Sequence, residues 1–207
     1  DSVWAGINLP QSYTGKNVII GVQDWGFDFT HPMFYDTTLT TSRILACWDQ
    51  YKTSGPSPSS YGYGTETIGF NDLQLLESDT SGMYDYATHG THVAGIAGGS
   101  GAGTPHRGMA FESDFLFNTL IIDESFAIDG WDWMYHYALG EGKRLVINNS
   151  WGVYQLGALD GTDLLSQAVD GLVQNDVVMV TSAGNNGDAN FHIRKAFAND
   201  TIRTQID

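Results

Sequence analysis

His89 lies in a run of mostly small residues, which predicts a tightly packed helix that carries a reactive side chain. The run reads Thr88-His89-Gly90-Thr91-His92-Val93-Ala94-Gly95. Threonine is a common helix cap, and we expect the Thr88 hydroxyl to cap this helix. Because glycine and alanine have almost no side-chain bulk, the helix can lie close against a neighbouring layer. A histidine held in this way has the fixed position that a proton-transfer group needs.

Asp24 and Asn185 follow two apolar runs elsewhere in the chain. Residues 17–23 are short, mostly apolar and rich in β-branched side chains, which predicts a strand buried on both faces with Asp24 at its carboxyl end. Residues 177–182 predict a further strand, and the turn Ala183-Gly184-Asn185-Asn186-Gly187 follows it. In open α/β sheets, catalytic groups gather at the carboxyl ends of the strands.

Together these three side chains match the needs of acyl transfer. That chemistry requires a base, a group that orients the base, and donors aimed at the developing oxyanion. An aspartate such as Asp24 can hold one ring nitrogen of His89, so that the other nitrogen faces a nucleophile. The side-chain amide of Asn185 can donate to the tetrahedral oxygen.

The elements that must position these groups alternate between strand and helix. Further strands are predicted at 44–51, 114–120 and 145–149, and apolar stripes predict helices over 128–140 and 164–173, the second capped by Thr162. This alternation implies one α/β domain over 1–207, with a mostly parallel sheet and helices on both faces. Residues 36–80 are interpreted as an insertion between the aspartate and the histidine. Residues 201–207 alternate like a strand that stops without a terminal element.

Composition narrows the classes of partner. The chain has 207 residues and a net charge of −15, which argues against binding a nucleic-acid backbone or an anionic membrane surface. No apolar run approaches the length of a membrane helix. The single cysteine, Cys47, cannot form a disulfide within the chain.

Four motifs resemble those of the subtilisin-like serine proteases, over roughly residues 15 to 187. They are Val22-Gln23-Asp24-Trp25-Gly26 with His31-Pro32, His89-Gly90-Thr91-His92-Val93-Ala94-Gly95, Ile147-Asn148-Asn149-Ser150-Trp151-Gly152, and Ala183-Gly184-Asn185-Asn186-Gly187. The resemblance implies a subtilisin-like three-layer sandwich that is incomplete at its carboxyl-terminal end. It also implies a serine endopeptidase without a cofactor, in which His89 is the general base, Asp24 its orienter and Asn185 the oxyanion donor.

The same resemblance implies the substrate site and the setting. Ser150, Trp151 and Gly152 would form one wall of a groove for an extended peptide or protein substrate, and Ala183 and Gly184 part of the other wall. Members of this family are typically exported, so the resemblance implies an extracellular or cell-envelope location. His92 is interpreted as a structural residue one helical turn after His89.

The sequence departs from the family pattern in three places. The family's nucleophile motif, Gly-Thr-Ser, does not occur in the 207 residues. We therefore expect the amino-terminal part of a catalytic domain, inactive alone, with the serine on a missing part and self-association through the uncovered face. Trp25 replaces the usual serine or threonine, so a small hydroxyl contact to Asp24 is lost. Met33 replaces an aspartate that helps many relatives to bind calcium, and we expect no metal there.

Two other classes of function fit some of the same residues. A shortened pseudoprotease would keep the groove and grip extended peptides without cleaving them. A metal-dependent hydrolase would use His89 and His92, with further ligands from Asp24, Asp28 and His31. The characteristic zinc-protease spacing, two histidines four apart with a glutamate between them, is missing.

Overall fold

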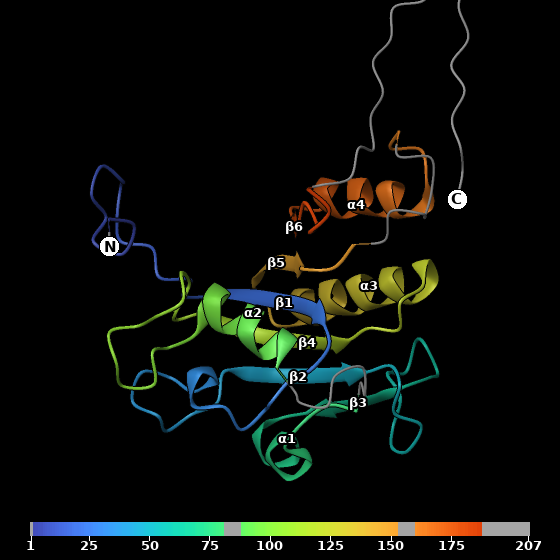
Figure 1. Ribbon diagram of the computed structural model, residues 1–207, viewed down its shortest axis with the longest axis horizontal. Helices are drawn as coiled ribbons and strands as arrows, with labels where there is room; N and C mark the ends of the chain where they lie inside the picture. The colour runs from blue at the N-terminus through green and yellow to red at the C-terminus, as the bar shows by residue number, and fades with distance from the viewer. Residues whose placement is uncertain (1, 81–87, 153–159, 188–207) are drawn as a thin grey trace, which may run out of the picture.

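The computed structural model of the chain describes residues 2–80, 88–152 and 160–187 (Figure 1). The helices are η1, a single 3-10 turn (Pro32–Phe34), α1 (Phe70–Leu76), α2 (His89–Gly98), α3 (Glu124–Gly140) and α4 (Leu164–Gln174). The strands are β1 (Val18–Asp24), β2 (Ile44–Asp49), β3 (Thr65–Ile68), β4 (Asp114–Thr119), β5 (Arg144–Asn149) and β6 (Val178–Thr181).

The strands form one sheet in the order β3-β2-β4-β1-β5-β6. Every pairing is parallel except that of β2 with β3. The chain therefore starts near the middle of the sheet, at β1, and adds strands on both sides. Ligands of open α/β sheets bind where the order reverses, which here is the carboxyl end of β1. The predicted mostly parallel sheet is confirmed.

Helices cover both faces of the sheet, as predicted (Figure 1). Successive side chains of a strand point to opposite faces. Along β1, Ile19 joins the hydrophobic cluster that contains the α3 side chains, whereas Ile20 and Val22 join the cluster that contains Ala94 of α2. The two-residue period therefore directs Asp24 to the face that α2 covers.

Three details differ from the sequence-based expectations. The Thr88 side chain makes no capping hydrogen bond, because the backbone there (φ −122°, ψ −40°) is not the extended one that a capping hydroxyl needs. Asp163, not Thr162, caps α4, and its carboxylate accepts a hydrogen bond from the Ser166 backbone N–H. Leu139, in the predicted apolar stripe of α3, is exposed.

The stretch 36–80 contributes to the sheet itself. It contains β2, which lies between β3 and β4, and α1, which contacts β2 and β3. Trp48 of β2 is fully buried against the rings of Tyr61 and Trp133. The Tyr61 hydroxyl donates to Asp132 of α3 over 2.7 Å, so this stretch is joined to α3 as well.

The opposite edge of the sheet is much less covered. Val178 and Val180 of β6 are 55% and 45% exposed, and no residue of α4 is buried. The predicted strand at 201–207 lies outside the described residues. Among the helices that the structure describes, none is both long and apolar enough to cross a bilayer.

Candidate active site

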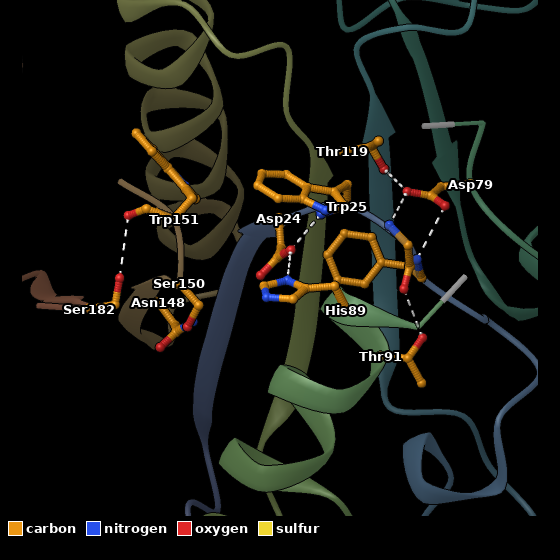
Figure 2. Close-up of polar contacts among 12 residues, drawn as sticks. Asp24, Trp25, Asp79, His89, Thr91, Thr119, Asn148, Ser150, Trp151 and Ser182 are labelled. Atoms are coloured by element: carbon orange, nitrogen blue, oxygen red, sulfur yellow. Dashed lines mark hydrogen bonds and ion pairs between the residues drawn. The ribbon is translucent and has the colours of Figure 1, made fainter. Parts of the chain in front are cut away.

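The sheet and α2 bring Asp24 and His89 into contact across 65 residues of sequence. Nδ1 of His89 lies 2.6 Å from Oδ1 of Asp24, and Figure 2 shows the two side chains meeting between the end of β1 and the start of α2. The Asp24 side chain is fully buried, whereas 39% of the His89 side chain is exposed. The contact therefore fixes one ring nitrogen and leaves a large part of the imidazole open to solvent.

Burial dominates the electrostatics of Asp24. It raises the pKa of the carboxyl, while hydrogen bonds from His89 and from the Trp25 backbone N–H lower it. The Trp25 N–H donates to the same oxygen, Oδ1, over 2.7 Å. The second oxygen, Oδ2, is buried and accepts no hydrogen bond among the described residues. This agrees with the expectation that replacing a small hydroxyl residue by Trp25 removes a contact to Asp24.

Trp25 instead contacts the imidazole through its ring. The indole stacks on His89 with centroids 5.4 Å apart and planes 17° from parallel, and Trp25 is almost completely buried. The imidazole is thus restrained by Asp24 at one nitrogen and by an aromatic face along its plane.

Gly90 allows the start of α2 to approach the turn that follows Asp24. Its backbone N–H donates to the Trp25 carbonyl over 2.6 Å. A Cβ at position 90 would lie 2.6 Å from a ring carbon of Phe27 and 2.8 Å from that same carbonyl oxygen. The close packing expected of the small residues is therefore present where His89 emerges.

The predicted substrate-wall residues Ser150, Trp151 and Gly152 follow β5 directly. Ser150 Oγ accepts a hydrogen bond from the Asn148 side chain over 3.0 Å. The Trp151 ring stacks on Trp131 of α3, with centroids 6.3 Å apart. Trp131, Trp151 and Gly152 line a cavity of about 470 Å³, which also has Leu165, Val169 and Met179 in its wall. An apolar side chain can be accommodated there.

Ala183, Gly184 and Asn185 follow β6 and are exposed. The Ser182 backbone N–H donates to the Asn149 carbonyl over 3.1 Å, which ties this segment to the end of β5. The strands β1, β5 and β6 are parallel, so their carboxyl ends lie at the same edge of the sheet. Asp24 ends β1 there, and Ser150 and Asn185 come after the ends of β5 and β6.

The structure adds a residue that sequence reasoning missed. Asp79 accepts hydrogen bonds from the backbone N–H groups of Gly26 and Phe27 and from the Thr119 hydroxyl. Burial raises the pKa of Asp79 to about 6, although these three donors lower it. The residue lies in the stretch interpreted as an insertion, and no motif surrounds it. An isolated acidic residue that lies 53 positions from Gly26, one of its hydrogen-bond partners, gives no local signal in the sequence.

Among the described residues, the side chains considered as metal ligands do not form a metal-binding cluster. Within the described ranges, no group of three or more His, Cys, Asp or Glu side chains could hold a metal ion. Nδ1 of His89 is directed at Asp24, and His92, one turn later, is exposed.

Known proteins share parts of this sequence and its fold. The sequence matches the family model described as the subtilase family over residues 15–202. It is 28% identical over 183 residues to subtilisin of Bacillus pumilus and to subtilisin E of Bacillus subtilis, covering 86% of this chain in both alignments. Those alignments cover 50% and 36% of the two relatives, so the chain spans half of the first and about a third of the second.

A solved structure shares the fold. The CspB protease of Clostridium perfringens superposes with a TM-score of 0.71 at 24% identity, over 90% of this chain and 39% of that one. At this level of identity the likeness concerns the fold alone.

Proposed function

The chain belongs to the subtilase family, and on that premise we propose that it supplies the acid–base half of a subtilisin-type serine endopeptidase. The observation that carries the proposal is the 2.6 Å contact between His89 Nδ1 and the fully buried Asp24 carboxylate, at the carboxyl end of a central strand. A carboxylate in that position fixes the imidazole tautomer, with the proton on Nδ1, and stabilises the imidazolium that forms.

In the proposed mechanism, His89 acts through Nε2. This nitrogen removes the proton of a serine hydroxyl as the oxygen attacks the peptide carbonyl, and later returns that proton to the leaving amine. Asp24 stays ionised throughout and holds the ring. The Asn185 amide donates to the oxyanion of the tetrahedral intermediate.

An extended substrate would lie along the ends of β5 and β6 in this proposal. Ser150, Trp151 and Gly152 form one wall, and Ala183 and Gly184 form part of the other. The apolar cavity at Trp131 and Trp151 supports a groove that takes a substrate side chain.

We further propose that the nucleophilic serine lies outside these 207 residues, so that the chain alone is inactive. The sequence has no Gly-Thr-Ser, and the exposed side chains of Val178 and Val180 on β6 leave an apolar face that a further segment would cover. If no such segment is present, we propose self-association through this face, which light scattering at high concentration tests. A stable monomer would contradict the association.

Two experiments test the proposed function. In the first, the coding sequence beyond Asp207 is determined, and we expect it to encode a Gly-Thr-Ser motif. The continuous protein is then expressed, and we expect it to cleave a chromogenic peptide. Replacing His89 by alanine should abolish cleavage. Replacing Asn185 by alanine should lower kcat by roughly 10²–10³, the range known from subtilisin itself for the loss of an oxyanion donor.

The second experiment uses the 207-residue chain alone. We expect no labelling by a fluorophosphonate probe, and labelling at Ser150 or Ser182 would contradict the assignment of the nucleophile. A continuous protein that binds extended peptides but has neither the serine nor cleavage activity would instead support the non-catalytic peptide-binding alternative.

The proposal also includes export of the protein, because members of the family are typically exported. Locating the protein in culture fractions tests this part.

A further inference from the structure

The turn that follows Asp24 is held from two sides. On one side, the Asp79 carboxylate accepts hydrogen bonds from Gly26 N–H over 3.0 Å and from Phe27 N–H over 3.2 Å. The Asp79 backbone N–H donates in return to the Phe27 carbonyl over 3.2 Å. Asp79 therefore accepts hydrogen bonds from the backbone amides of Gly26 and Phe27, which lie two and three residues after Asp24.

On the other side, α2 binds the carbonyl groups of the same turn. Gly90 N–H donates to the Trp25 carbonyl, and both the N–H and the hydroxyl of Thr91 donate to the Gly26 carbonyl over 3.0 Å. These donors lie one and two residues after His89. The turn is thus the direct link between the strand that carries Asp24 and the helix that carries His89 (Figure 2).

Asp79 is itself anchored to the sheet. The Thr119 hydroxyl at the end of β4 donates to Asp79 Oδ2 over 2.8 Å. The next residue, Thr80, donates through its N–H and its hydroxyl to Oδ2 of Asp49 at the end of β2. Two carboxylates, Asp79 and Asp49, therefore pin this segment to the strand ends beside β1.

We propose that Asp79 is a positioning residue of the candidate active site, which holds the turn at Gly26 and Phe27 so that the Asp24 carboxylate stays against the His89 ring. This inference rests on the Asp24–His89 pair of the proposed function and adds to it a third carboxylate, which acts through the turn and touches neither the imidazole nor substrate. A carboxylate suits the role because both its oxygens accept hydrogen bonds. An asparagine of the same shape would turn an NH₂ group toward one of the backbone donors.

Proton NMR of the 207-residue chain tests the proposal without any need for protease activity. A proton held between an imidazole nitrogen and a carboxylate at 2.6 Å gives a resonance far downfield of ordinary ring protons. We expect this resonance in the wild type, and its loss or a clear upfield shift in Asp79→Asn. Thr119→Val, which removes only one of the three donors to Asp79, should cause a smaller shift in the same direction.

Asp163→Ala is the matched control, because it removes the cap of α4 and lowers stability without contacting the turn. Its downfield resonance should stay at the wild-type position. An unchanged resonance in a folded Asp79→Asn variant would overturn the inference, and so would an unchanged resonance in Thr119→Val if Asp79→Asn does not fold. Absence of the resonance in the wild type would instead contradict the Asp24–His89 pair itself, and with it the proposed function.

Discussion

Replacing Gly90 by alanine should strain the packing that brings α2 to the active-site turn. The added Cβ would lie 2.6 Å and 2.8 Å from two carbons of the Phe27 ring and 2.8 Å from the Trp25 carbonyl oxygen. Carbon atoms in contact normally stand about 3.5–4.0 Å apart, so the ring and the backbone must both move by about 1 Å. Phe27 is fully buried and has little room to do so.

The matched control is Gly95→Ala in the same helix, where a Cβ would have nothing within 4 Å. Alanine is favoured over glycine in a helix by up to about 1 kcal/mol, a gain that both variants share. The steric cost falls on Gly90→Ala alone, and overpacking of this kind costs about 1–3 kcal/mol. We expect the upper part of that range because one of the clashing atoms belongs to the backbone.

Urea unfolding followed by circular dichroism measures both variants against the wild type. Gly95→Ala should be as stable as the wild type or more stable, and Gly90→Ala should be less stable than Gly95→Ala by about 3 kcal/mol. If the two variants have the same free energy of unfolding, α2 does not approach the turn as closely as described, and the placement of His89 beside Asp24 is undermined.

Three further predictions concern buried and capping carboxylates. Burial raises the pKa of Asp79 to about 6 from 3.8, so the free energy of unfolding falls as the pH rises from the unfolded-state pKa through the folded-state pKa. Urea titrations should therefore show that the wild type loses about 2 kcal/mol of unfolding free energy relative to Asp79→Asn between pH 4 and 7. Asp163→Ala should cost about 1 kcal/mol at neutral pH, because the carboxylate caps α4 at the Ser166 N–H, and thermal unfolding would show no loss if that cap is unimportant. Trp25→Thr should lower the pKa of Asp24 by giving its buried Oδ2 a hydroxyl donor, which a carboxyl ¹³C titration would reveal; an unchanged or higher pKa would contradict this account.

The positions of Asp24 and His89 were predictable because each is encoded by its immediate neighbours. A buried apolar run predicts the strand that ends at Asp24, and the small residues around His89 predict a close-packed helix. Parallel strands then place their carboxyl ends at one edge, which also accounts for Ser150 and Asn185. Local pattern and sheet topology together were sufficient to place these residues at that edge, while the roles of Ser150 and Asn185 stay predictions.

Asp79 and the ring of Trp25 were not predictable in the same way. The Asp79 contacts span 40 to 53 residues and depend on how the stretch 36–80 folds back onto β1 and β4. The substitution at Trp25 predicted a lost hydroxyl contact, but the stacking on His89 depends on side-chain packing that no local pattern specifies. The predicted cap at Thr88 is absent because the backbone there is not extended, which the residue type alone does not specify.

The strand order has a consequence for synthesis on the ribosome. All the contacts described above that hold Asp24 against His89 come from residues up to Thr119, within the inner strands, whereas β5 and β6 are added afterwards at one side. A polypeptide emerges amino-terminus first, and its early portion can fold before translation ends. Under the proposed function, the imidazole could be aligned while the groove is still being made, and the growing chain would stay inactive until the residues that carry the serine are made.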